Sequence, residues 1–254
     1  MTYQAITYEV AGGVALITLN RPEVMNALNR QMRLELTMAV RLAQDQARVL
    51  VLTGAGRGFC AGQDLAAGLP DIEQTLRDEY EPMLMAIVES RIPTIAAVNG
   101  IAAGAGANLA LAFDVVIAAE SASFIQAFTR IGLIPDAGGS WFLPRQIGMA
   151  RAMGAMLFAD KISAAQALAW GMIYETAPDA DFTAHWQARA TALAQGPELA
   201  YTALKQALRA SPGNCLPEQL ALEAELQARC GGTDDFREGV AAFLEKRVPK
   251  FQGR

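Results

Sequence analysis

The chain has 254 residues, of which 52% are hydrophobic and 19% are charged, with a formal net charge of −5. This length suits one large domain or two small ones, and the apolar fraction is sufficient for a substantial core. The acidic balance argues against nucleic acid as the main partner, and no apolar run reaches the length of a membrane span. The opening MTYQAITYEV lacks a basic region followed by an apolar core, so no secretory signal is expected. We therefore expect a cytoplasmic protein without nucleic-acid or membrane partners.

The three cysteines, Cys60, Cys215 and Cys230, have neither CxxC spacing nor an even count. This usage predicts a reducing compartment, with no disulfide framework and no zinc site. The single histidine, His185, lies in a stretch of helical periodicity and is expected to be a surface or packing residue. A Ser-His-Asp or Cys-His hydrolase would have to use it, and no G-x-S-x-G motif accompanies it.

The first part of the chain alternates short apolar runs with amphipathic segments. Strands are predicted at 6–10 and 14–19 around a Gly-Gly turn, at 49–53, 94–98 and 115–119, with a strand or turn at 123–128. A helix capped by Asn29 is predicted to run to about Asp45, and a second over 71–90. Alternating strands and helices of this kind predict an α/β fold.

From residue 141 onward the pattern is helical. Helices are predicted at 149–158, 164–170, 182–194, 198–210, 218–228 and 236–246, separated by Gly or Pro signals. We therefore predict an α/β core over residues 1–200, and a helical region over 201–254 that packs on itself or on another subunit. The closing KRVPKFQGR is basic, which fits either a solvated tail or a docking point for an anionic ligand.

Two glycine-rich turns follow predicted buried strands, GAGRGFCAGQDL at 54–65 and IAAGAGANLALA at 101–112. The carboxyl ends of strands are where open α/β sheets bind ligands. The first turn fits neither the dinucleotide fingerprint nor the P-loop, and Asp64 within it is a candidate cap of a short helix. Small residues also serve tight helix–strand packing, but two such turns in succession favour a binding site.

An aspartate, Asp136, lies in the stretch IGLIPDAGGSW at 131–141, with apolar residues before it and Gly138-Gly139 after it. A carboxylate framed by apolar side chains is desolvated, so its pKa should lie above that of a solvated aspartate. Taken alone, this stretch favours a helix N-cap, because aspartate followed by glycine and serine is a common helix start.

The segments RPEVMNAL, GRGFCAGQDL, AAVNGIAAGAGANLAL, IGLIPDAGGSW and AFLEKR, in this order, resemble the enoyl-CoA hydratase/isomerase (crotonase) superfamily over essentially the whole chain. The resemblance implies a spiral of ββα turns carrying an acyl-CoA site, followed by a helical trimerisation region. It also implies trimers or dimers of trimers. The substrate would be an acyl-CoA thioester, with no metal and no cofactor beyond the coenzyme A of the substrate itself.

The resemblance also implies roles for individual residues. The thioester oxygen would lie between the main-chain N–H groups of Gln63 and Ala105, which would stabilise an enolate. The two glutamates of the hydratases correspond to Asn108 and Phe128 here, and neither side chain can transfer a proton. Asp136 stands where the isomerases of the superfamily place their acid, and one carboxylate suffices to move a proton between two carbons.

The aryl-CoA dehalogenases of the superfamily add a histidine in the region of 78–90, which this chain lacks. LTGAGRGFCAGQDL, ARAMG and the REGV ending instead resemble the isomerases of ring-epoxidised phenylacetyl-CoA. By position, the substrate contacts would be Ala61, Asp64, Leu65, Gly104, Asn108, Phe128 and Gly139, joined by Phe243 and Lys246 from a neighbouring subunit.

The expected activity is conversion of ring-1,2-epoxyphenylacetyl-CoA to oxepin-CoA in aromatic (phenylacetate) catabolism, with double-bond isomerase activity beside it. Three alternatives stay open: a Δ3-Δ2-enoyl-CoA isomerase of fatty acid oxidation, a hydratase-like protein of weak hydratase activity, and an idle CoA- or RNA-binding member. The acyl pocket is expected to be formed by residues 69–85 and 128–141. Its shape would distinguish the fatty acyl-CoA isomerase from the predicted ring-epoxide isomerase.

Overall fold

The computed structural model describes residues 3–68 and 71–253 of the chain, so the first two positions of the expected acyl pocket, 69 and 70, lie outside the described residues. The larger sheet has the strand order β1-β2-β3-β5-β7-β10. Its strands are β1 (Ile6–Ala11), β2 (Val14–Leu19), β3 (Val49–Gly54), β5 (Thr94–Val98), β7 (Val115–Ala119) and β10 (Glu175–Ala177). All neighbours pair in parallel except the β1–β2 hairpin. The continuous apolar runs of the sequence therefore become strands covered on both faces.

A smaller sheet with the order β4-β6-β8-β9 lies beyond the first. Its strands are β4 (Gly58–Cys60), β6 (Ile101–Ala103), β8 (Ser123–Ile125) and β9 (Ile162–Ser163). Each of the pairs β3–β4, β5–β6 and β7–β8 gives one strand to each sheet before the chain turns into helix. The mixed α/β fold is confirmed, and the repeated unit is the expected ββα turn.

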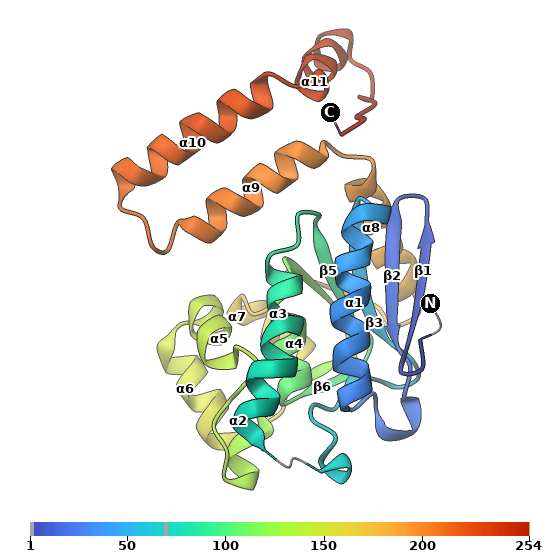
Figure 1. Cartoon of the computed structure of the whole chain (residues 1–254), viewed down its shortest axis with the longest axis vertical. Helices are drawn as coiled ribbons and strands as arrows, with labels where there is room; N and C mark the ends of the chain where they lie inside the picture. The colour runs from blue at the N-terminus through green and yellow to red at the C-terminus, as the bar shows by residue number, and fades with distance from the viewer. Residues whose placement is uncertain (1–2, 69–70, 254) are drawn as a thin grey trace.

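The helices cover the sheets on the outside, and α1 packs beside α3 over the larger sheet (Figure 1). The Asn29 side chain caps α1 by accepting from the Met32 N–H at 2.9 Å, as the sequence predicts. The α-helices of this part are α1 (Arg30–Gln46), α2 (Ile72–Thr75), α3 (Glu81–Val88), α4 (Ala105–Leu111), α5 (Gly139–Ile147), α6 (Met149–Phe158), α7 (Ala164–Trp170) and α8 (Phe182–Ala194). Short turns of 3₁₀ helix are η1 (Pro22–Val24), η2 (Leu65–Ala67) and η4 (Ala127–Ile131).

Two details differ from the sequence prediction. The helix expected over 71–90 is broken into α2, a π-helix η3 (Leu76–Tyr80) and α3. The short strands β4, β6, β9 and β10 were not expected, because each has two or three residues. Such strands are too short to show an alternating pattern, and two of them lie inside the glycine-rich turns.

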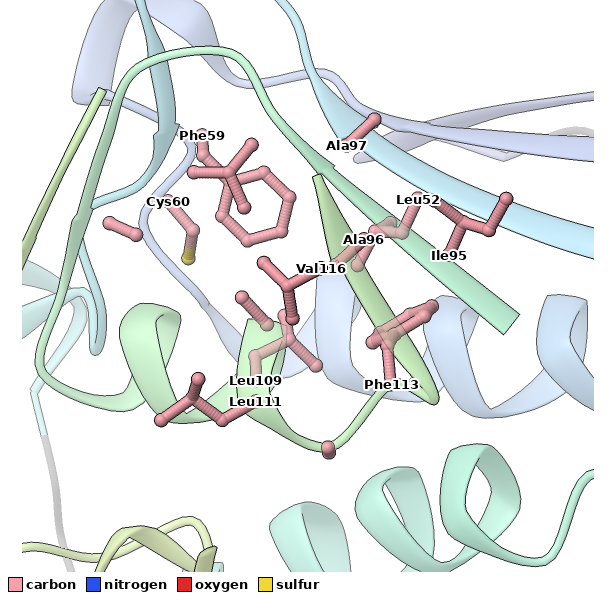
Figure 2. Packing of buried hydrophobic residues seen from close by; sticks show 14 of the residues in the cluster. Leu52, Phe59, Cys60, Ile95, Ala96, Ala97, Leu109, Leu111, Phe113 and Val116 are labelled. Carbon is pink, nitrogen blue, oxygen red and sulfur yellow. The ribbon is translucent and has the colours of Figure 1, made fainter. Parts of the chain in front are cut away.

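One part of the core lies between the two sheets and α4, and the core continues beneath α1, α3 and α8. Figure 2 shows Phe59, Cys60, Leu109 and Val116 in one buried cluster, with Leu52 and Ala96 of the larger sheet beside it. Phe59 and Cys60 are fully buried in β4, immediately before the first glycine-rich turn reaches the surface. The middle of this turn is therefore buried in the core, which limits its freedom to move.

The last three helices, α9 (Glu198–Ala210), α10 (Leu216–Gly231) and α11 (Asp234–Glu245), stand away from the α/β core (Figure 1). Lys205 fastens α9 to the core, because its buried ammonium donates to the Ile92 carbonyl at 2.6 Å and pairs with Asp114. Large apolar side chains of these helices are exposed, including Leu204, Leu208, Leu220, Phe243 and Leu244. A helical C-terminal region is thus confirmed, beginning three residues before the predicted boundary.

Candidate functional site

A cavity of about 230 Å³ opens where the two glycine-rich turns meet η3 and η4. Its lining includes seven residues expected in the site from sequence, which are Ala61, Gln63, Leu65, Gly104, Ala105, Phe128 and Asp136. We call it the turn cavity. It brings together main-chain groups from two crossovers and one carboxylate, over residues that are up to 75 positions apart in the chain.

The first turn is fixed by a parallel bridge between Leu28 and Gln63. The Leu28 N–H donates to the Gly62 carbonyl at 2.7 Å, and the Asp64 N–H donates to the Leu28 carbonyl at 3.1 Å. In such a bridge the middle residue, Gln63, directs its own N–H to the opposite side from the partner strand. This N–H is therefore available to a ligand in the turn cavity, which Gln63 lines.

The second turn begins α4 at Ala105, and the first N–H groups of a helix have no acceptor within it. Gly104 has a φ of 53°, which a glycine adopts without strain. At Gly62 a Cβ would lie 2.7 Å from the Ala103 carbonyl oxygen and 3.3 Å from the Ala105 nitrogen, so the two turns are in van der Waals contact. The two expected N–H donors thus belong to adjoining turns on one cavity wall.

Asp136 lines the same cavity, and the interpretation as a helix cap is wrong. The N-cap of α5 is Gly138, and it makes no side-chain cap bond. The buried Oδ1 of Asp136 has no hydrogen-bond partner, and desolvation raises the pKa of this carboxyl to about 6. The predicted rise and its predicted cause, desolvation, are both confirmed. Of the apolar residues that precede Asp136, Ile131 and Leu133 line the cavity with it, whereas Ile134 is 82% exposed.

Asn108, expected from the resemblance as a substrate contact, bonds instead to the main chain behind the Asp136 carboxylate and to Gln126. Its Nδ2 donates to the main-chain carbonyl of Asp136 at 2.8 Å, and its Oδ1 accepts from Gln126 Nε2 at 2.8 Å. It is fully buried and does not line the cavity. Gly139 allows this arrangement, since a Cβ there would lie 2.2 Å from Asn108 Nδ2. Asn108 thus holds the main chain at Asp136, and Gly139 leaves the space that the Asn108 side chain needs.

Asp64 is buried, and its carboxylate pairs with Arg21 at 2.9 Å. Leu65 is 58% exposed at the rim of the cavity, and Ala61 is also exposed. Phe243 and Lys246 lie at the end of α11, far from the turn cavity of the same chain (Figure 1). Within one chain the structure therefore does not bring these two residues to the site, and their expected contact with a neighbouring subunit stays a prediction.

A second cavity of about 550 Å³ adjoins the first, and Leu76, Tyr80 and Asp136 line both. Its wall is mostly apolar, with Leu84, Met85, Val88, Trp141 and Phe142. Trp141 and Phe142 stack edge to face at 5.0 Å between ring centroids. We call it the aromatic cavity. Its lining falls within the two segments expected to form the acyl pocket, apart from Val88 and Phe142, which lie just outside them, and Asp136 lines both cavities.

Sequence reasoning missed a polar cluster beneath the first turn, formed by Arg33, Glu79, Tyr80 and the Gln63 side chain. One signal could have revealed it. Arg33 falls three residues before Leu36 and seven before Val40, on the apolar face of α1, where a charge needs a partner. Within 3–68 and 71–253, no group of three or more His, Cys, Asp or Glu could hold a metal ion, and no helix could cross a membrane.

Comparisons with known proteins agree with this geometry. The enoyl-CoA hydratase/isomerase family model matches residues 9–254. A relative from Rhodobacter capsulatus, named "Probable enoyl-CoA hydratase", is 62% identical over the full length of both chains. The 1,2-epoxyphenylacetyl-CoA isomerase of Escherichia coli is 45% identical over 98% of each chain.

Solved structures share the fold over the whole chain. The crystal structure of the enoyl-CoA hydratase of Bacillus anthracis superposes with a TM-score of 0.93 at 33% identity, covering 99% of this chain and all of the other. The crotonase-type spiral with a helical C-terminal region is thus confirmed. The chain therefore belongs to the enoyl-CoA hydratase/isomerase family and is an enzyme that acts on CoA thioesters.

Proposed function

We propose that this enzyme is an acyl-CoA isomerase that converts ring-1,2-epoxyphenylacetyl-CoA to oxepin-CoA and also shifts double bonds in unsaturated acyl-CoAs. The observation that carries the proposal is the single carboxylate of the turn cavity. Among the described residues that line it, Asp136 is the only acidic one, and it faces two turns with main-chain donors. The positions of the hydratase glutamates hold Asn108, which is fully buried, and Phe128.

The proposed mechanism needs one proton carrier. The Asp136 carboxylate takes a proton from the carbon next to the thioester, and the electron pair moves onto the thioester oxygen. The N–H groups of Gln63 and Ala105 stabilise the resulting enolate, an interaction that strengthens as negative charge develops. For the ring epoxide, the carbon–carbon bond shared by the epoxide and the six-membered ring breaks as the ring double bonds shift, which gives the seven-membered oxepin with its oxygen retained. Asp136, now protonated, returns the proton to a ring carbon of the oxepin, or to the far carbon of the shifted double bond in a 3-enoyl-CoA. The composition of either substrate is unchanged. A carboxyl with a pKa near 6 can serve as both base and acid near neutral pH.

The aromatic cavity supports the ring substrate. Its rings, from Tyr80, Trp141 and Phe142, offer apolar ring faces and edges to a six-membered ring attached one carbon from the thioester. The Escherichia coli relative named for this reaction is the second support. The exposed apolar residues of α9 to α11 support assembly as a trimer or dimer of trimers. We further propose that the enzyme is cytoplasmic and that Phe243 and Lys246 reach the CoA of a neighbouring subunit.

The test is an assay of the purified enzyme on ring-1,2-epoxyphenylacetyl-CoA, on a 3-enoyl-CoA and on a 2-enoyl-CoA. We expect the first two to be isomerised, the third to be hydrated poorly, and Asp136→Asn to lose roughly 10³-fold or more in kcat. Asp160→Asn is the matched control, because this aspartate is exposed just after the end of α6, lines neither cavity and should leave kcat unchanged. Fast hydration that survives Asp136→Asn would show a hydratase instead, and full isomerase activity of Asp136→Asn would refute the mechanism.

A further inference from the structure

Arg33 is a buried charge that the mechanism above does not use. It lies in α1, its side chain is 4% exposed, and its guanidinium reaches the back of the first turn. We propose that Arg33 is a positioning residue that fixes the direction of the Gln63 main-chain N–H toward the substrate oxygen. This inference rests on the proposed function of that N–H.

The guanidinium connects both strands of the bridge that shapes the turn. Its Nη1 donates to the Leu28 carbonyl at 2.8 Å and to Gln63 Oε1 at 2.7 Å. Leu28 and Gln63 are the two residues paired in the bridge. The planar fork of arginine suits this task, because one nitrogen can donate to two acceptors in fixed directions. Arg33 thus links the main chain of one strand to the side chain of the other.

Glu79 holds the other edge of the guanidinium. Its Oε2 accepts from Arg33 Nε at 2.9 Å and from Arg33 Nη2 at 2.6 Å. Glu79 belongs to the π-helix η3, whose residues Leu76 and Tyr80 line both cavities. A π-helical turn inside an α-helical segment is frequent at functional sites, because it rotates neighbouring side chains into new directions. The ion pair between Arg33 and Glu79 therefore couples the first turn to η3, which lines both cavities together with Asp136.

Tyr80 completes the clamp around the Gln63 side chain. Its hydroxyl donates to Gln63 Oε1 at 2.6 Å, while Gln63 Nε2 donates to the Asp64 carbonyl at 3.1 Å. The Arg33 guanidinium also lies 4.8 Å from the centre of the Tyr80 ring. With both ends of its amide bonded, the Gln63 side chain cannot rotate, and its own main-chain N–H is held with it. A donor that is fixed before the reaction stabilises the enolate without reorganising.

The experiment compares Arg33→Met with Arg30→Met. Arg30 pairs with the same Glu79 at 3.2 Å, but its side chain is 75% exposed and it does not contact Gln63. We expect Arg33→Met to lower kcat for the 3-enoyl-CoA by about 10- to 100-fold with KM changed less than about threefold, since misplacement of a donor affects the transition state most. Arg30→Met should leave both constants unchanged.

A readout without turnover separates positioning from stability. A dialkylaminocinnamoyl-CoA absorbs at longer wavelength when donors pull charge onto its thioester oxygen, so the shift on binding reports the N–H groups directly. We expect the shift to be strong with the unaltered enzyme and with Arg30→Met, and to be lost in large part with Arg33→Met. Arg33→Lys, which keeps the charge but not the fork, should give an intermediate shift.

If Arg33→Met does not fold, Arg33→Lys and Gln63→Met take its place, because Gln63→Met keeps the main-chain N–H and removes the acceptor that the clamp holds. An unchanged shift and an unchanged kcat in these variants would overturn the inference. A failure of the proposed function is distinguishable, because then the unaltered enzyme would not isomerise either substrate, or Asp136→Asn would retain full activity.

Discussion

The two walls of the turn cavity are built in opposite ways. On the wall of Gln63 and Ala105, the main chain is fixed by a bridge, by close glycine contacts and by side-chain bonds. On the wall of Asp136, the main chain is also held, by Asn108, but the carboxylate oxygen Oδ1 is buried with no partner. The difference follows from the chemistry: a group that stabilises charge must be preorganised, whereas a group that carries a proton must stay free to give and receive it.

The largest effect is expected at Gly106, which packs the start of α4 against the first turn. A Cβ there would lie 2.3 Å from the Cys60 carbonyl oxygen and 2.7 Å from Cys60 Sγ, so Gly106→Ala must move the first turn of α4 and with it the Ala105 N–H. We expect kcat to fall about 100-fold, as for loss of one such donor. The matched control is Gly154→Ala in α6, where a Cβ has open space. It should keep full activity and gain about 0.5–1 kcal/mol of stability.

Steady-state kinetics and thermal unfolding of both glycine variants test this contrast. If Gly106→Ala kept its kcat, the position of α4 would not control the donor, and the wall would be less rigid than the contacts indicate.

The main chain of Asp136 is held by the Asn108 side chain. Asn108→Ala removes the bond to the Asp136 carbonyl and leaves Gln126 Nε2 without its acceptor. The segment of Asp136 can then shift, and we expect kcat to fall about 10- to 50-fold with a small change in KM. Leaving buried polar groups unpaired should also cost about 1–3 kcal/mol of stability. A variant with normal kcat and only the stability loss would show that the carboxylate finds its place without this bond.

The dependence of kcat/KM on pH tests whether the Asp136 carboxylate is the desolvated catalytic base. Because burial raises the pKa of Asp136 to about 6, the base form is complete only above that pH. We expect kcat/KM to be flat above about pH 7 and to fall tenfold per pH unit below 6. Binding of a saturated acyl-CoA over the same range is the control, because the phosphates of CoA also titrate. A profile that is flat down to pH 4.5 would contradict a desolvated catalytic carboxylate.

Whether a contact of this site can be predicted from the sequence depends on how far apart its two residues lie along the chain. The buried parallel strands, the Asn29 cap and the two glycine-rich turns are local patterns, and they were predicted. The bond from Asn108 to the Asp136 carbonyl joins residues 28 positions apart, and the one from Arg33 to Gln63 joins residues 30 apart. No local pattern reports which acceptor a buried side chain will meet. The sequence therefore predicts residues that line one cavity, but not the contacts that hold them.

The smallest expected effect is on the free energy of unfolding. It measures the cost of burying the Asp136 carboxylate, whose Oδ1 has no hydrogen-bond partner. The pKa of about 6 in the folded chain lies above that of a solvated aspartate, so the folded state binds the proton more tightly than the unfolded state. The contribution of this group to stability is complete below about pH 4 and is lost as the pH rises through 6. Asp136→Asn has no such loss. We expect it to be more stable than the unaltered enzyme by about 2 kcal/mol at pH 7.5 and equally stable at pH 4, in urea unfolding at both values. If the difference in stability between Asp136→Asn and the unaltered enzyme were the same at both pH values, the Asp136 carboxylate would be solvated in the folded chain.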